Sequence, residues 1–208
     1  MCCDSNLDSH WFEDKSLIYD AKTQSWHSPS SCIWAEHQIQ LPGKVSIATA
    51  YKGLSSFFLK VLRITKPTLQ MHVEALKRKA SNDPDKRDIF QAVLNICAFN
   101  PTPETLEKLS DCKCLPVKLK SGIRQWCDRS GCFAIVDRRE YERSFAGKID
   151  VLDFSMEETH AIKPFLLGLG LEERYMSKAV KEETRALDGS IDQRLTQDLR
   201  KKAYAICR

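Results

Sequence analysis

The chain of 208 residues lacks the features by which membrane and secreted proteins are usually recognised. No stretch of it approaches the ~20 consecutive apolar residues needed to cross a bilayer. Its first residues, MCCDSNLDSHWFEDK, carry acids where a signal peptide needs bases, and they contain no apolar core segment. We therefore expect an intracellular protein, cytoplasmic or nuclear, with no membrane partner.

The short motifs of the common enzyme classes are also missing. The chain contains no P-loop, no GxGxxG fingerprint, no nucleophile elbow and no HExxH. Gly168-Leu-Gly170 follows no predicted strand and lacks a third glycine, so we interpret it as the exit of a helix. No catalytic residue is predicted, and we do not expect an enzyme.

A strong excess of one charge is absent as well. The net charge is only +4, which is milder and less clustered than is typical of a nucleic-acid binder, so no nucleic-acid partner is expected. Apolar residues make up 42% and charged residues 29%, close to the globular average. The composition therefore indicates a folded chain.

The hydrophobic pattern predicts an α/β or α+β fold with a small β-rich N-terminal cap, a helical middle and a C-terminal mixed α/β part. We expect a loose N-terminus over 1–15, a β-hairpin plus helical segment over 16–110 and a mixed α/β segment over 111–208. No linker rich in glycine, proline or serine separates the last two segments. One continuous domain over 16–208 is therefore the alternative.

In the N-terminal cap, Ser16–Asp20 predicts a short strand. The Ser28-Pro29 pair marks a tight bend between Trp26 and Trp34, and we expect a small hairpin with both tryptophans packed near it. Further apolar segments cover 38–41 and 45–48.

The middle of the chain carries helical periodicity and helix-start signals. Four apolar residues at helical spacing predict one buried face: Leu54, Phe57, Phe58 and Val61. Pro67 suits the first turn of the next helix, and Asp83-Pro84 suits the start of the one after it. Ile89, Val93 and Ile96 should be buried on that helix. Thr102-Pro103 predicts the start of a short helix that carries Leu106 and Leu109.

The C-terminal part alternates between strand and helix patterns. Strands are expected over 114–119 and 124–129 as a hairpin, and over 133–137 and 149–154. Helices are expected over 138–145, after Ser155 and over 191–206. Ser155 and Glu158 form a capping-box pattern, and Pro164 should bend or restart the helix that they begin.

Cysteine spacing gives the one metal-like pattern in this part of the chain. The chain has nine cysteines and no secretory signal, so reduced thiols are expected. Cys112, Cys114, Cys127 and Cys132 could bind Zn²⁺ if two hairpins brought the four thiolates together. The first pair is closer in sequence than zinc ligands usually are. Small structural thiols without a cofactor are therefore the alternative.

Several acidic residues lie where α/β proteins place catalytic groups. Asp137, Asp150 and Asp153 follow or end predicted strands. Glu157 and His160 are i, i+3 neighbours that could meet on one helix face. Helix capping and local ion pairs account for the same residues, so these carboxylates are not assigned a catalytic role.

Several strings of the sequence resemble an internal region of very large fungal proteins. They include WHSPSSCIWAEHQIQLPGKVSIA, TKPTLQMHVEAL, FAIVDRREY, IDVLDFSMEE, KPFLLGLGLEERYMSKAVKEET and DLRKKAYAICR, and the resemblance spans 16–208. Those proteins carry an Hsp90-like (GHKL) ATPase domain near their N-terminus and are distantly related to plant No Vein and to sacsin. The nucleotide site of such proteins precedes this region, and its DxGxG loop and lid are not found here.

The resemblance implies a post-ATPase segment that transmits conformational change or binds a protein. It also leads us to expect a truncated form or fragment of such a protein. We therefore expect a non-catalytic interaction or structural module that contacts a protein partner or itself through exposed apolar surface. The alternatives are an accessory protein or enzyme of a fungal biosynthetic gene cluster and a small zinc-binding module.

Overall fold

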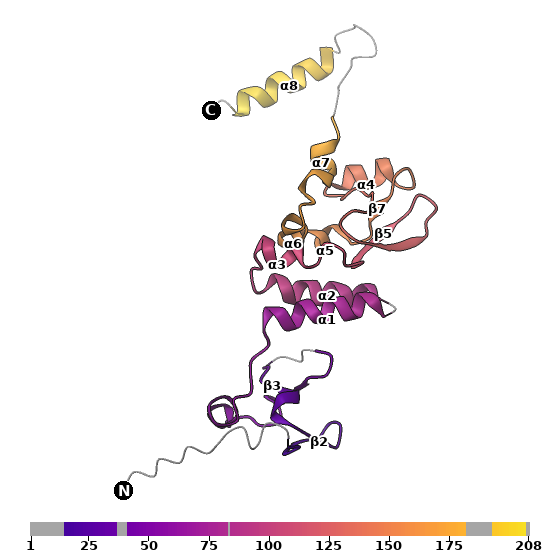
Figure 1. The fold of residues 1–208 in the computed structure, drawn as a ribbon. Coiled ribbons are helices and arrows are strands. Elements are labelled where there is room, and N and C mark those ends of the chain that lie inside the picture. Colours follow the sequence, from indigo (N-terminus) through magenta and orange to yellow (C-terminus); the bar gives the residue numbers. More distant parts are fainter. Residues whose placement is uncertain (1–14, 37–40, 83, 182–192, 207–208) are drawn as a thin grey trace.

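The fold is α+β and consists of three parts that follow one another along the chain (Figure 1). The computed structural model describes residues 15–36, 41–82, 84–181 and 193–206. A lobe of short strands at 15–67, called the N-terminal lobe below, is followed by a pair of helices and then by a part that mixes helices with a small sheet. The loose terminus predicted over 1–15 lies almost wholly outside the described residues, as do residues 38–40 of a predicted apolar segment.

Two small two-stranded sheets build the N-terminal lobe. Strand β1 (Ile18–Asp20) pairs antiparallel with β2 (Ser25–His27), and β3 (Cys32–Ile33) pairs parallel with β4 (Val45–Ser46). The Asp20 carboxylate closes the β1–β2 turn, because it accepts the Lys22 N–H at 3.0 Å and the Thr23 hydroxyl at 2.9 Å.

The predicted small hairpin is present, but it does not turn at the Ser28-Pro29 bend, and only one of the two tryptophans is buried. The hairpin turns at 21–24, whereas the Ser28-Pro29 bend becomes the short 3₁₀ helix η2 (Pro29–Ser31). Trp26 is 61% exposed beside Tyr19, whereas Trp34 is buried and stacks on Phe58. The turn residues before Trp26 satisfy their own hydrogen bonds through Asp20, so the chain reverses earlier than the proline indicates.

The segment 54–61 is largely helical as predicted, but most of its apolar residues are not buried. Residues Phe57–Val61 form the π-helix η3, in which the Leu62 N–H donates to the carbonyl of Phe57. A π-helix bonds residue i to i+5, which shifts the side chains around the helix, so apolar residues at α-helical spacing do not all turn toward the core. Phe58 alone is buried, whereas Leu54, Phe57 and Val61 are each about half exposed.

Two antiparallel helices form the middle of the molecule (Figure 1). Helix α1 (Leu69–Ser81) begins after Thr68, whose hydroxyl accepts the Met71 N–H, so Pro67 lies just before the helix and not in its first turn. Helix α2 (Lys86–Cys97) begins after Asp85, whose carboxylate accepts two N–H groups at 2.8 and 3.2 Å. The start predicted at Asp83-Pro84 is therefore two residues early. The predicted core positions Ile89, Val93 and Ile96 are buried.

The C-terminal part is built around a three-stranded sheet of order β6-β5-β7. Strands β5 (Leu115–Lys118), β6 (Arg124–Cys127) and β7 (Val151–Leu152) pair antiparallel, which confirms the predicted hairpin. The strand predicted over 133–137 is reduced to two isolated bridges, from Ala134 to Val151 and from Ile135 to Tyr175.

Short helices surround this sheet. They are α3 (Pro103–Glu107), α4 (Arg139–Phe145), α5 (Met156–Ala161), α6 (Lys163–Gly168), the 3₁₀ helix η4 (Glu172–Arg174) and α7 (Met176–Ala179). The capping box of Ser155 and Glu158 and the start of α3 after Thr102 are confirmed. Farther along, the helix predicted over 191–206 is observed as α8 (Gln193–Ile206).

One hydrophobic core runs from α1 to Tyr175 and crosses the boundary predicted near residue 110. It joins the helix pair, the sheet and α6, and Phe165 is its largest side chain with no exposed surface. A smaller cluster around Trp34 and Phe58 fills the N-terminal lobe. Among the described residues, no helix is long and apolar enough to cross a membrane.

Candidate functional site

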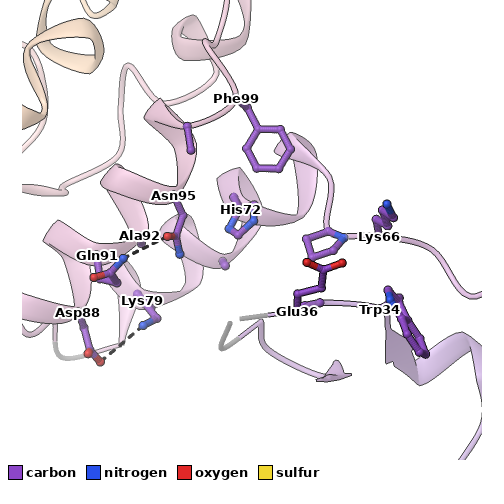
Figure 2. A pocket seen from close by; sticks show the side chains of 14 residues that line it. Trp34, Glu36, Lys66, His72, Lys79, Asp88, Gln91, Ala92, Asn95 and Phe99 are labelled. Atoms are coloured by element: carbon purple, nitrogen blue, oxygen red, sulfur yellow. Dashed lines mark hydrogen bonds and ion pairs between the residues drawn. The ribbon is translucent and has the colours of Figure 1, made fainter. Parts of the chain in front are cut away.

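A first cleft lies between the N-terminal lobe and the two central helices (Figure 2). Its volume is about 1030 Å³. Helix α1 contributes His72 and Lys79, and helix α2 contributes Asp88, Gln91 and Asn95. Trp34, Glu36 and Lys66 face them from the lobe in Figure 2.

Two pairs of polar side chains lie in the wall of this cleft, among apolar residues. The Gln91 amide donates to the Asn95 amide oxygen at 3.1 Å, and Lys79 Nζ lies 3.6 Å from Asp88 Oδ2. His72 is 3% exposed, and its ring lies 5.3 Å from the Phe99 ring. Carboxamides and a buried imidazole suit hydrogen bonding to a polar ligand. Among the described residues, no serine or cysteine nucleophile lines the cleft.

His72 should make the stability of the protein depend on pH. Burial lowers the pKa of His72, so the folded chain binds a proton less readily than the unfolded chain does. Neutral His72 therefore contributes fully to the free energy of unfolding above the unfolded pKa of about 6.5. This contribution is lost as the pH falls below that value. Between pH 7 and pH 5 we expect the free energy of unfolding to fall less steeply for His72→Phe than for the wild type. The difference in slope should be at most about 1.4 kcal/mol per pH unit.

Urea denaturation of both proteins at a series of pH values measures this difference. Above pH 8 both side chains are neutral, so the offset between the two curves should be constant there and serves as the internal control. Parallel curves down to pH 5 would show that His72 does not cause the effect.

A second cleft of about 830 Å³ brings together residues that the sequence analysis singled out. Asp137, Glu157 and His160 all line it, although they come from the segment before α4 and from α5. The Asp137 carboxylate accepts the Ser177 N–H at 3.1 Å, which ties that segment to α7. Glu172 of η4 and Tyr175, which follows it, also line the cleft.

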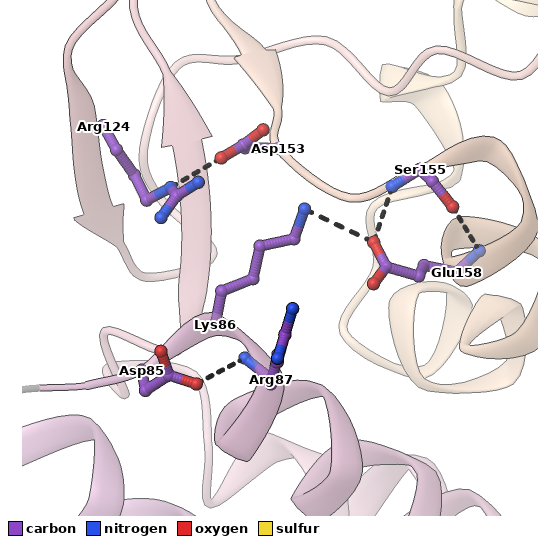
Figure 3. Close-up of polar contacts among 7 residues, drawn as sticks. All are labelled: Asp85, Lys86, Arg87, Arg124, Asp153, Ser155 and Glu158. Carbon is purple, nitrogen blue, oxygen red and sulfur yellow. Dashed lines mark hydrogen bonds and ion pairs between the residues drawn. The ribbon is translucent and has the colours of Figure 1, made fainter.

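Asp150 and Asp153 do not line either cleft. Asp153 forms an ion pair with Arg124 of β6, with Oδ2 2.5 Å from Nε (Figure 3). Asp150 accepts the Lys120 N–H at 2.8 Å and so closes the turn after β5. Both carboxylates therefore hold the edges of the sheet together.

Glu158 has a structural role at the junction of α2 and α5. Its carboxylate accepts the Ser155 N–H at 2.7 Å within the capping box and lies 3.4 Å from Lys86 Nζ (Figure 3). Lys86 is the first residue of α2, so this ion pair links the helix pair to the C-terminal part. Figure 3 also shows Asp85 beside Arg87 at the start of the same helix.

Comparison with known proteins shows the family to which the chain belongs. The family model described as Domain of unknown function (DUF8348) matches residues 70–180, more than half of the chain. The chain belongs to the DUF8348 family. Searches of curated proteins and of solved structures gave no match.

The DUF8348 segment contains the whole lining of the second cleft. It begins inside α1, so it excludes the N-terminal lobe, whose residues Trp34 to Glu36, Lys66 and Pro67 line the first cleft. The second cleft is therefore a feature of the DUF8348 segment itself, whereas the first cleft also requires the N-terminal lobe.

The four predicted zinc ligands also lie in the DUF8348 segment, but they are not gathered at one point. Cys112 and Cys114 interact through their thiols, which raises the pKa of the fully buried Cys114 thiol, and burial raises it further. Burial likewise raises the pKa of Cys127, and Cys132 is exposed. The same contact lowers the pKa of the Cys112 thiol.

Within the described parts of the chain, no three His, Cys, Asp or Glu side chains form a group able to hold a metal ion. The structure thus brings the thiols of Cys112 and Cys114 into contact. The four-cysteine zinc site stays a prediction.

Three site residues escaped the sequence analysis: His72, Glu172 and Tyr175. His72 lies within α1 directly before the buried Val73, and Glu172 and Tyr175 follow the LGLGL string. Their importance comes from burial against distant segments, for which the DUF8348 sequence contains no local signal.

Proposed function

We propose that this DUF8348 protein is a non-catalytic intracellular module that binds a protein through the exposed apolar surface of its N-terminal lobe. The supporting observation is the exposure of Leu54, Phe57 and Val61, which are 50%, 47% and 48% exposed. Three large apolar side chains within eight residues on a surface are a common mark of a protein contact.

The proposal is consistent with the resemblance of the chain to an internal region of large fungal proteins that carry an Hsp90-like ATPase domain. In such a protein this surface would be covered by a neighbouring segment. When the chain stands alone, a second copy or another protein takes that place. We call Leu54, Phe57 and Val61 the apolar patch.

The test is the oligomeric state of the purified chain. We expect the wild type to self-associate with increasing concentration, as measured by sedimentation velocity, and the double variant Phe57→Glu, Val61→Glu to remain monomeric. Because both side chains are about half exposed, the melting temperature should change little.

Lys60→Glu is the matched control, because it lies in the same π-helix, is exposed and changes the net charge by the same amount as the double variant. It should leave self-association intact. A wild type that stays monomeric at all concentrations and melts sharply and reversibly would count strongly against the proposal.

The second candidate function is that of an accessory protein or enzyme acting on a small molecule. The observation that favours it is the second cleft, which brings Asp137 and His160 to one cavity. If product formation by the producing organism were unchanged after substitution of both residues, this candidate would be eliminated.

A further inference from the structure

Two cysteines separated by one residue are in contact just before the central strand β5. The thiols of Cys112 and Cys114 are free and hydrogen-bond each other. The backbone holds both residues in place. The Cys114 N–H donates to the Cys112 carbonyl at 2.8 Å, and the Cys112 N–H donates to the Leu109 carbonyl at 3.0 Å. The first of these bonds closes a three-residue turn around Lys113.

The turn around Lys113 gives the backbone a shape that suits a disulfide between the two cysteines. A disulfide usually joins Cα atoms that lie about 4.4–6.8 Å apart. Extended backbone advances by about 3.3–3.6 Å per residue, so it would place the two Cα atoms near or beyond the upper end of that range. The turn shortens this span. Because the turn already exists in the folded chain, closing the ring costs little further chain entropy.

The two cysteines differ in their surroundings, which gives each a different place in a reaction. Cys114 is 1% exposed and belongs to the hydrophobic core, whereas Cys112 packs against that core and is only partly buried. A reagent from solution therefore meets Cys112 first. The hydrogen bond from Cys114 lowers the pKa of the Cys112 thiol, and the positive charge of Lys77 lowers it further. A larger share of Cys112 is therefore present as the thiolate, which is the reactive form.

We propose that Cys112 and Cys114 form a reversible redox pair that reacts with a small disulfide such as oxidised glutathione. Cys112 loses its proton and attacks one sulfur of the small disulfide, which releases one reduced glutathione and leaves the other in a mixed disulfide on Cys112. Cys114 then loses its proton and attacks the Cys112 sulfur, which releases the second glutathione. The pair gives up two electrons and two protons, and both reduced glutathione molecules take them up.

The pair lies within the DUF8348 segment, in a different hydrophobic cluster from the lobe that carries the apolar patch. Its test is therefore independent of the proposed function. Disulfides in the cytosol are usually transient and serve catalysis or redox sensing, so a pair of this kind would act as a switch and not as a permanent crosslink.

Peptide mapping after exposure of the full chain to about 5 mM oxidised glutathione tests the inference. Free thiols are blocked with N-ethylmaleimide before digestion, so that disulfides do not exchange. Trypsin cuts after Lys108, Lys113 and Lys118, so a disulfide within the pair keeps peptides 109–113 and 114–118 together. We expect this linked species, without maleimide, from more than about half of the chains, and its complete loss in dithiothreitol.

Two variants and one control separate the two steps. Cys114→Ala removes the thiol that completes the disulfide, so glutathione should stay attached to Cys112. Cys112→Ser removes the thiol that reacts first, so Cys114 should carry neither glutathione nor a disulfide. Cys132→Ser removes an exposed thiol of the same segment and should leave the linked species unchanged. Circular dichroism checks that each variant is folded, and Cys112→Ser carries the test if Cys114→Ala does not fold.

Three results would overturn the inference. Recovery of Cys112 and Cys114 as maleimide adducts would show that the pair does not react. A disulfide from Cys114 to Cys127, which lies opposite Leu115 on the neighbouring strand, would show that a different pair forms. Protection of both thiols from glutathione that ends when a chelator is added would show that they bind zinc instead.

Discussion

Replacing Phe165 with alanine should lower the free energy of unfolding by about 3–5 kcal/mol. Phe165 lies in α6, has no exposed surface and packs in the core that joins the central helices to the C-terminal sheet. The substitution removes the apolar area that the ring buries and leaves a cavity that the surrounding helices fill only partly. Since natural domains are stable by about 5–15 kcal/mol, this loss would be a large share of the total.

Leu167→Ala on the same helix is the control for this prediction. Leu167 is 42% exposed, so its truncation should cost less than about 1 kcal/mol. Chemical denaturation monitored by tryptophan fluorescence measures both variants, and Phe165→Leu supplies an intermediate point if the alanine variant does not fold. Similar losses at 165 and 167 would show that α6 does not anchor the core.

The sequence predicted correctly those features that depend only on residues close to one another along the chain. Thr102 caps α3 and the Ser155–Glu158 pair caps α5 as predicted, because a cap depends on residues three positions apart. The core positions of α2 were also found from their spacing. The start of α2 was misplaced, because Asp83 and Asp85 carry the same signal and only the structure shows which carboxylate accepts the free N–H groups.

Features that depend on distant segments could not be predicted. Helical spacing cannot reveal a π-turn, so the apolar patch was expected to be buried. Gly168 illustrates the same limit: it was predicted to mark a helix exit, but it also lies where a Cβ atom would be 2.2 Å from Leu106 Cδ1, so α6 can approach α3 closely. The exit itself is completed by Gly170, whose φ of 73° suits glycine.

The residues of the candidate sites also divide into those with a local sequence signal and those without one. Asp137 and His160 were singled out from their positions near strand and helix ends, and they do line one cleft. Their neighbours Glu172 and Tyr175 were missed because the burial of a side chain by remote segments leaves no mark in its own sequence context.

Replacing Arg174 should also destabilise the protein strongly. Its guanidinium donates to the carbonyl oxygens of Gly131 and Arg129, the latter at 2.7 Å, and lies 4.6 Å from the Phe133 ring centroid. These contacts fasten the turn after β6 to the 3₁₀ helix η4. Arg174→Met should lower the free energy of unfolding by about 2–4 kcal/mol, because it removes two charge-assisted hydrogen bonds and leaves two carbonyls without their donor.

Arg129→Met is the matched control, since it makes the same change of side chain and charge within the segment that Arg174 holds. The Arg129 guanidinium pairs with both oxygens of Glu107 at 2.6 and 2.7 Å, but the two side chains are 38% and 60% exposed. Water and side-chain entropy offset most of the gain from such a surface pair, so its loss should cost less than about 1 kcal/mol. Urea denaturation of the two variants compares them directly. A loss at Arg129 as large as that at Arg174 would contradict the prediction, since the stability would then depend on the surface ion pair and not on the partly buried contacts to the backbone.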